Sequence, residues 1–225
     1  MATLQLYDKL LQFPLFQGMS FSDLTQLVAH TKFGFLKLPA GKRVIKDGER
    51  CDRIYLLTNG CLRHESISDD HSYSVVEEIQ APALIQPECI TGLTQRFHGT
   101  FHTLTEVHFI TIDKREMGIL SDTFLVFRLN LLNIFATHTQ KMQRRLWARC
   151  PRSLHNRIVR FFMDHCNHPA GRKTFHIKME QLATELNDSR INISRALNAM
   201  QAKGMVTLGR SRIEIPAIEH LVMGE

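Results

Sequence analysis

Six side chains between residues 190 and 198 are of the types that contact base edges in a DNA groove. Arginine pairs with guanine, asparagine with adenine, and an apolar side chain touches the thymine methyl group. On a helix turning about 100° per residue, one face carries Ile191, Arg195 and Asn198, flanked near the helix start by Arg190, Asn192 and Ser194. We predict that this segment reads bases, with Arg195 contacting guanine and Arg190 contacting a base or a phosphate.

The surrounding residues predict two short helices joined by a tight turn. Apolar residues recur at spacings of three and four on both sides of the turn, as in amphipathic helices. They are Met179, Leu182, Ala183 and Leu186, then Ile193, Ala196, Leu197 and Met200. Asn187 suits a left-handed turn position and Ser189 suits an N-cap. This pattern is typical of a helix-turn-helix; the alternative is an ordinary helical hairpin with a solvated basic face.

Residues 205–215 predict two short strands around Gly209-Arg210-Ser211, which would form a wing beside the second helix. We expect Ser189, Arg210 and Arg212 to contact DNA phosphates. The charge distribution agrees with a polyanionic partner for this half of the chain. Residues 1–140 contain 13 Lys and Arg against 15 Asp and Glu, whereas residues 141–225 contain 15 against 7. A basic surface that only aids solubility is the alternative.

The overall composition is ordinary for a folded protein. A chain of 225 residues with 44% hydrophobic and 22% charged residues can form two domains with their own cores. No apolar run is long enough to span a bilayer, and the start lacks a signal-peptide pattern, so we expect a cytoplasmic protein with no membrane partner. The cysteines lack metal-ligand spacing, so we expect reduced structural thiols and no iron–sulfur cluster. They are Cys51, Cys61, Cys89, Cys150 and Cys166.

Residues 33–113 predict an antiparallel β-roll of the double-stranded β-helix or jelly-roll type. Short apolar runs alternate there with turn residues, and helices are expected before and after them. The predicted strands are 33–38, 43–45, 54–58, 61–66, 73–79 and 107–112. Asn59-Gly60 between two of these runs predicts a tight hairpin. With the C-terminal winged helix-turn-helix, the fold class is therefore α+β.

At this point the sequence resembles the Crp/Fnr family of bacterial transcription regulators, over nearly its whole length. The resemblance rests on motifs in the family's order. They are Pro39-Ala40-Gly41, Val44-Ile45-x-Asp47-Gly48 and Ile54-Tyr55-Leu56-Leu57-x-Asn59-Gly60 in the roll, then Arg157-Ile158, Leu182-Ala183 and Ser189-Arg190 to Arg195-x-Leu197. It implies a DNA-binding homodimer, not an enzyme, that is gated by an effector in the roll and possesses a surface for RNA polymerase.

The resemblance also locates a candidate effector pocket. Ligand-binding members hold a cyclic nucleotide with a Gly-Glu pair and, some ten residues later, an Arg-Ser or Arg-Thr pair. Here the first pair is replaced by Pro87-Glu88, and His98-Gly99 stands where the arginine is expected. The candidate pocket residues are Glu88, Arg96, His98, Gly99, Thr100 and Thr139. Because a bidentate guanidinium contact to phosphate is missing, we predict that cyclic AMP is not the effector.

Several other ligands and functions remain open. The spacing of His98, His102 and His108 includes no H-x-H pair, so we predict no metal site, whereas haem bound by His or Cys is an alternative because some relatives sense gases with haem. The chain would then be a haem-based redox or nitrosative-stress sensor. A constitutive regulator with a vestigial pocket is the second alternative. A β-barrel enzyme is the remote third, since no catalytic constellation has a recognisable spacing.

A long helix is expected over residues 122–149, with an apolar stripe close to a coiled-coil repeat of about 3.5 residues. The stripe contains Leu125, Leu129, Leu132, Phe135, Thr139, Met142 and Leu146. The resemblance makes it the dimerisation helix. We therefore predict a sensor roll with its helical lead-in over 1–120, the dimerisation helix and hinge over 121–150, and the DNA-binding domain over 151–225. Such a dimer would bind an inverted repeat with half-sites about 34 Å apart.

Overall fold

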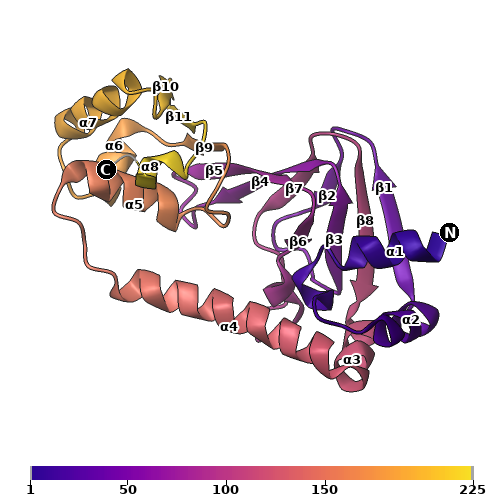
Figure 1. The fold of residues 1–225 in the computed structure, drawn as a ribbon. Coiled ribbons are helices and arrows are strands. Elements are labelled where there is room, and N and C mark those ends of the chain that lie inside the picture. The colour runs from indigo at the N-terminus through magenta and orange to yellow at the C-terminus, as the bar shows by residue number, and fades with distance from the viewer. Residues whose placement is uncertain (1, 224–225) are drawn as a thin grey trace. The chain divides into compact units, whose positions relative to one another are not determined.

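The computed structural model describes residues 2–223, with side chains described for residues 6–221. The chain mixes helices with antiparallel sheets, which confirms the predicted α+β class (Figure 1). It divides into two compact units, and each is described by itself. Unit 1 comprises Met1–Leu62, Gln80–His98 and His102–Trp147; unit 2 comprises Arg63–Ile79, Gly99–Phe101 and Ala148–Glu225.

Unit 1 is built on a four-stranded antiparallel sheet in the order β1-β8-β3-β6. These strands are β1 (Phe33–Leu38), β8 (Val107–Asp113), β3 (Arg53–Asn59) and β6 (Ala83–Ile85). The unit also contains α1 (Ala2–Leu10), the 3₁₀ helix η1 (Pro14–Phe16), α2 (Phe21–His30), β2 (Arg43–Ile45) and the 3₁₀ helix η2 (Pro87–Ile90). In the central pair, Ile54 faces Ile112 and Leu56 faces Ile110, and all four side chains are buried. These pairs belong to the hydrophobic core of the unit.

Two helices end unit 1. The carboxylate of Asp113 caps α3 (Lys114–Thr123) by accepting a hydrogen bond from the Glu116 N–H at 2.8 Å. Phe124 is extended, so α4 (Leu125–Trp147) starts three residues later than predicted and ends two residues earlier. Phe127 and Leu131 are buried, and the ring of Phe127 contacts that of Phe16. One side of the first half of α4 is therefore held within its own chain.

Unit 2 combines a β-hairpin from the middle of the chain with the C-terminal helices. Its sheet runs β10-β11-β9-β5-β4. The strands are β4 (Cys61–Ile67), β5 (Ser74–Gln80), β9 (Lys173–His176), β10 (Thr207–Gly209) and β11 (Arg212–Ile215), and β7 (Thr100–Thr103) starts in the same unit. The helices are α5 (Leu154–Asp164), α6 (Met179–Glu185), α7 (Arg190–Ala202) and α8 (His220–Met223). Antiparallel pairing of Val75 with Phe175 joins β5 to β9.

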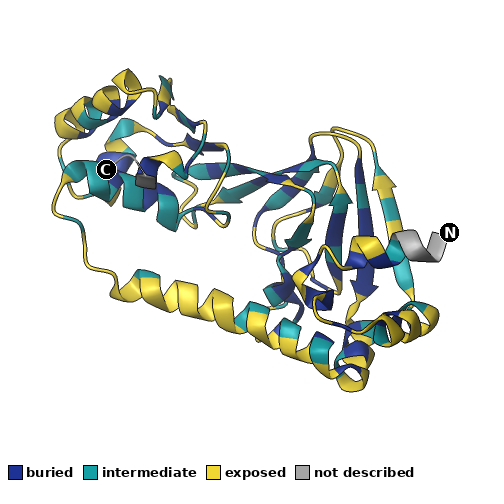
Figure 2. Cartoon of the chain, in the orientation of Figure 1, coloured by how far each residue is buried: buried dark blue, intermediate teal, exposed yellow. Residues whose placement is uncertain are grey.

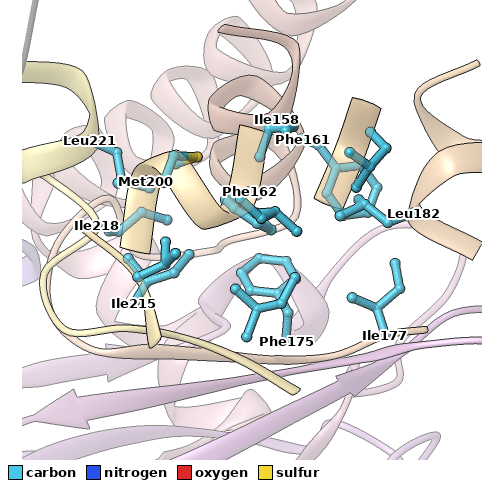
Figure 3. Packing of buried hydrophobic residues seen from close by; sticks show 14 of the residues in the cluster. Ile158, Phe161, Phe162, Phe175, Ile177, Leu182, Met200, Ile215, Ile218 and Leu221 are labelled. Atoms are coloured by element: carbon cyan, nitrogen blue, oxygen red, sulfur yellow. The ribbon is translucent and has the colours of Figure 1, made fainter. Parts of the chain in front are cut away.

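The core of unit 2 lies between its helices and its sheet (Figure 3). Phe162 of α5 packs on Phe175 of β9 with ring centroids 4.6 Å apart, and Leu182 and Met200 bring in α6 and α7. All four side chains are buried to 1% exposure or less. This single core fixes the orientation of α7 relative to the sheet.

One local prediction was wrong. Gly60 has a φ of +91° and separates β3 from β4, but these two strands do not pair, because β3 lies beside β8 and β6 while β4 lies beside β5. Asn59-Gly60 therefore connects strands of two different sheets and is not a hairpin turn. A Cβ atom at Gly60 would collide with the carbonyl oxygen of Glu106, so close backbone approach explains the glycine.

All six strands predicted between residues 33 and 113 are present, with ends that differ by no more than one residue. The strands β6 and β7, which are three and four residues long, were not predicted. Among the described residues, no single helix is long and apolar enough to cross a membrane; only the bent pair of α3 and α4, taken together, meets that criterion.

Candidate nucleic-acid interface

The turn between α6 and α7 has the local geometry that its residues predicted. Asn187 adopts a φ of +48°, which asparagine tolerates better than most side chains. The Ser189 hydroxyl accepts a hydrogen bond from the Asn192 N–H at 3.2 Å and so caps α7. The Asp188 N–H donates to the carbonyl of Ala183 at 3.0 Å, which closes the end of α6. The predicted cap and left-handed residue are both confirmed.

The buried side of α7 determines which residues face solvent. Ile193, Leu197 and Met200 are 0–1% exposed in the core. The opposite side is exposed over Arg190, Ile191, Asn192, Arg195 and Asn198, while Ser194 is half-buried (Figure 2). Ile191 is 65% exposed, so an apolar side chain lies open to solvent on this otherwise polar face. The structure therefore gathers all six predicted base-reading residues on or beside one exposed face.

The charged groups of this face are weakly engaged within the protein. Arg190 lies 3.4 Å from a carboxylate oxygen of Glu180, and both side chains are more than two-thirds exposed. Arg195 has no ion-pair or hydrogen-bond partner among residues 6–221. Because exposed ion pairs contribute at most about 1 kcal/mol, both guanidinium groups are available to a polyanion.

A half-buried network lies behind the first turn of α7. Arg157 of α5 donates from Nη1 to the carbonyl of Leu186 at 2.8 Å and from Nη2 to Oδ2 of Asp188. Oδ1 of Asp188 accepts from the Ser189 N–H and from the Asn192 side-chain amide, both at 2.8 Å. Hydrogen bonds from Asn192 and Ser189, with the Arg157 charge, lower the pKa of Asp188.

The wing has the predicted two strands and a two-residue turn. Gly209 pairs with Arg212, and Ser211 has a φ of +53°. Arg210 at the tip is exposed, whereas the Arg212 guanidinium lies 2.9 Å from Glu214. A hydrogen bond from Arg172 at 2.6 Å also engages Glu214 and lowers its pKa. Arg210 is therefore the less restrained of the two predicted phosphate contacts.

A buried ionic cluster holds the β4–β5 hairpin to the wing sheet. Lys173 Nζ lies 3.0 Å from Glu77 Oε1, and His64 Nδ1 lies 3.7 Å from Glu77 Oε2. All three side chains are 0–1% exposed. Glu77 also accepts the backbone N–H groups of Asn167 and His168 at 3.0 and 3.1 Å. Burial alone would raise the pKa of Glu77, but the His64 hydrogen bond, the Lys173 charge and the two N–H groups outweigh it and lower the pKa to about 2.

Sequence reasoning missed both networks. Arg157 was considered only as part of a family motif. For Glu77 a signal existed: Val75, Glu77 and Ile79 alternate along one strand, which places the carboxylate on the buried face. Its partners His64 and Lys173 come from two other strands, β4 and β9, and no local pattern identifies them.

The segment 86–100, where the effector pocket was predicted, uses its polar groups internally. The Gln86 side chain donates to the His98 carbonyl at 2.7 Å and accepts from the His98 N–H at 2.9 Å. Arg96 lies outside the named strands, in an isolated β-bridge with Arg50, and its guanidinium donates to the Gly48 carbonyl at 2.7 Å. Glu88 lies in η2, half-exposed. In unit 1, therefore, the arginine nearest to the expected phosphate site contacts the protein backbone.

The remaining predicted pocket residues occupy different surroundings. Gly99 has a φ of +84°, and a Cβ atom there would collide with the His64 ring and the Glu65 carbonyl. Thr100 opens β7, next to Phe101, whose ring stacks on His64 with centroids 4.2 Å apart. The Thr139 hydroxyl donates to the Phe135 carbonyl within α4 at 3.0 Å. Gly99 is thus required by packing in unit 2.

The cysteines are all free thiols. Burial raises the pKa of Cys51 to about 11 and that of Cys89 to about 12, so both thiols remain protonated at neutral pH. Among the described residues, no group of three His, Cys, Asp or Glu side chains is arranged to hold a metal ion. His108 instead lies 3.1 Å from Glu106.

The apolar stripe predicted on α4 for dimerisation, here called the seam, is exposed along most of its length (Figure 2). Leu125, Leu129, Leu132 and Met142 are between 48% and 58% exposed, and Leu146 is 82% exposed. Thr139 is exposed and Phe135 is half-buried. Since Phe127 and Leu131 already pack within the chain, the seam is a second apolar stripe whose large side chains face solvent in a single copy.

Comparison with known proteins identifies residues 156–223 as matching the family model of the Crp-like helix-turn-helix domain. The catabolite activator protein of Thermus thermophilus aligns with a TM-score of 0.51 and 17% identity, over 94% of this chain and 99% of that chain. A protein described as a transcriptional regulator of the Crp/Fnr family from Eubacterium rectale gives 0.51 and 19%, over 94% and 97%.

The sensor domain of the transcriptional regulator DNR from Pseudomonas aeruginosa aligns with a TM-score of 0.52 and 15% identity, over 68% of this chain and 99% of that domain. The search of curated proteins found no match. At these identities the structural comparisons establish the fold, while the family match establishes the type of the C-terminal domain.

Proposed function

The chain has the fold of a Crp/Fnr-type regulator and carries a Crp-like helix-turn-helix domain, and from this premise we propose that it binds an inverted-repeat operator as a homodimer and regulates transcription. The observation that carries the proposal is the exposed face of α7. Its residues are of base-reading types, and the buried side of the helix fixes their orientation. Crp-like helix-turn-helix regulators bind DNA through this helix, and no catalytic role is proposed.

We assign Arg195 to a guanine, where its free guanidinium can pair with O6 and N7. Arg190 contacts a base or a phosphate, and the exposed Ile191 contacts a thymine methyl group. Ser189, Arg210 and Arg212 contact phosphates at the edge of the groove. An isoleucine beside Arg190 implies an operator half-site with a T at the base pair that it covers.

The exposed stripe of α4 supports the homodimer. Leucine side chains at steps of three and four pack well against a second copy of the same stripe, and a two-fold axis then places two recognition helices about 34 Å apart. Paired Leu129→Asp and Leu132→Asp substitutions should yield monomers by light scattering and weaken operator binding. The matched control is Asn133→Asp on the same helix, which should remain dimeric.

We further propose that an effector other than cyclic AMP controls DNA binding. Arg96 is engaged by a backbone carbonyl and Gln86 holds His98, so phosphate binding would require breaking internal hydrogen bonds. These internal hydrogen bonds also favour a second candidate function, a constitutive regulator in which the roll is a scaffold. A ligand shifts the DNA-binding equilibrium only if it binds one arrangement more tightly.

One experiment tests the proposal. Purified protein is equilibrated with a library of random inverted repeats, with and without cyclic AMP, and the bound DNA is sequenced. We expect selection of one palindrome, unchanged by cyclic AMP and lost with Arg195→Ala. Equal binding to all sequences would contradict the proposal. If the protein purified from its own cells carries a small molecule or haem whose removal abolishes selection, the gated regulator is favoured over the constitutive one.

A further inference from the structure

The first turn of α7 is tied to α5 by a forked arginine. Arg157 reaches acceptors on both sides of the left-handed residue Asn187: the carbonyl of Leu186 at the end of α6, and Asp188 at the start of α7. The side chains of Arg157 and Asp188 are 22% and 16% exposed. A half-buried fork of this kind fixes an angle as well as a distance, and lysine cannot reproduce its two directed contacts.

The two oxygens of Asp188 have different partners. Oδ2 faces Arg157, and Oδ1 accepts hydrogen bonds from the Ser189 N–H and from Nδ2 of Asn192. A carboxylate with these partners accepts hydrogen bonds and donates none, so the group of Asn192 that faces it has to be the amide nitrogen. The carboxylate therefore sets the orientation of the Asn192 amide by chemistry as well as by geometry.

We propose that Arg157 and Asp188 are positioning residues that make Asn192 present its carbonyl oxygen to a base amino group. The inference rests on the proposed function, because it requires α7 to enter the major groove. One N–H of Nδ2 donates to Asp188 at 2.8 Å, so the amide is oriented with Oδ1 away from the carboxylate, and Oδ1 is the acceptor that Asn192 presents, with the second N–H beside it. In the major groove the donors are adenine N6 and cytosine N4, whereas guanine and thymine present acceptors there. Asn192 thus selects an amino base at one operator position.

The negative charge of Asp188 strengthens this selection. It lies directly behind Asn192 and repels the O6 and N7 acceptors of a guanine at the same position. Arg157 keeps the carboxylate in place and partly offsets its charge, which also reduces its repulsion from the DNA phosphates. Neither residue needs to touch a base, and both act through the amide of Asn192.

The test is a double-mutant cycle read out as base preference. After wild-type protein has selected its operator, binding is measured to four operators that differ only at the position contacted by Asn192. We expect wild-type protein to favour A or C by about tenfold. Asp188→Ala should reduce that preference to less than about threefold, and in the Asn192→Ala background it should have no further effect on preference. Glu185→Ala, an exposed carboxylate of α6, is the matched control and should leave the preference unchanged.

A second variant covers the case in which Asp188→Ala unfolds. Asp188→Asn keeps the shape and one acceptor oxygen but removes the charge, and it should reduce the preference in part. An unchanged preference in every folded Asp188 variant, or an equal loss in the Asn192→Ala background, would overturn the inference alone. A wild-type protein that selects no sequence would overturn the proposed function, and this inference with it.

Discussion

The exposed face of α7 and the segment 86–100 were both predicted to bind a partner, but their polar groups are arranged in opposite ways. On α7, Arg195 is free among the described residues and Arg190 has only an exposed ion pair. In the segment 86–100, Arg96 contacts a backbone carbonyl and Gln86 makes two hydrogen bonds to His98. The guanidinium groups on α7 are thus free or weakly paired among the described residues, whereas Arg96 and Gln86 of the segment 86–100, here called the closed segment, are engaged by the protein's own backbone.

The difference also concerns what lies behind each region. The core of unit 2 and the Arg157–Asp188 network support α7 from its buried side. The buried cluster around Glu77 supports the sheet of the same unit. In the segment 86–100 the internal contacts involve the very groups that would bind a ligand. On α7 the supporting contacts leave the Arg195 guanidinium and the Asn192 carbonyl oxygen available and so preorganise the surface, whereas the contacts of Arg96 and Gln86 would have to be broken before these groups could bind a ligand.

The largest effect is expected at the support of the unit that carries α7. Glu77→Ala leaves the Lys173 ammonium buried without its counterion, so it should lower the free energy of unfolding by about 3–5 kcal/mol. Urea unfolding followed by circular dichroism measures this loss. Glu78→Ala, the neighbouring half-exposed carboxylate, should cost less than about 1 kcal/mol. Equal effects of the two substitutions would mean that the cluster is not the support.

The same carboxylate predicts a pH dependence. The pKa of Glu77 is lowered to about 2 in the folded protein, so its stabilising contribution is complete above the unfolded value near 4.5 and is lost as the pH falls from there toward 2. The free energy of unfolding should therefore decrease on acidification through this range. Glu77→Gln should flatten that part of the curve. Parallel curves for the two proteins would contradict the lowered pKa.

The next effect concerns Arg195. Arg195→Ala should reduce specific DNA affinity by about 1–3 kcal/mol, or roughly 5- to 150-fold, because a bidentate guanine contact is lost. Fluorescence anisotropy with the selected operator measures it. The contrasting variant is Arg96→Ala in the closed segment, which should leave DNA affinity and the response to cyclic AMP unchanged. A weaker effect at Arg195 than at Arg96 would reverse the comparison.

A smaller effect is expected from opening the closed segment. Gln86→Ala removes two hydrogen bonds to the backbone of His98, each with a net contribution of about 0.5–1.5 kcal/mol, and should lower the stability of unit 1 by about 1–2 kcal/mol. Thr94→Ala, exposed in the same segment, is the control. Calorimetry measures the unfolding temperature with and without cyclic AMP, and we expect cyclic AMP to stabilise neither the wild-type protein nor Gln86→Ala. If cyclic AMP stabilised Gln86→Ala alone, the two hydrogen bonds of Gln86 would be the barrier to its binding.

The helix-turn-helix could be predicted almost completely because its signals are local. The spacing of Ile193, Leu197 and Met200, the left-handed Asn187 and the cap at Ser189 each act within a few residues, and all are present. Asn59-Gly60 carries an equally strong local signal, yet tertiary pairing overrides it, since β3 and β4 enter different sheets.

The support of the interface was beyond local reasoning for a related reason. The alternation around Glu77 indicates a buried carboxylate, but its counterion Lys173 and its neighbour His64 reach it only through pairing of β5 with other strands. Likewise, Arg157 lies on α5, whereas Asp188 lies in the turn between α6 and α7. Patterns within one element predict which face is buried, whereas the partners across elements depend on the assembled sheet and core.

The smallest effect tests how free the α7 face is. Glu180→Gln removes the exposed partner of Arg190, and because such pairs contribute at most about 1 kcal/mol, thermal stability should change little. DNA affinity should rise slightly, since a carboxylate near the phosphates is removed and Arg190 no longer has to leave an ion pair. Anisotropy over a series of salt concentrations separates this electrostatic gain from specific contacts. A fall in affinity would instead show that Glu180 holds Arg190 in its reading position, and α7 would then resemble the closed segment more than its exposure indicates.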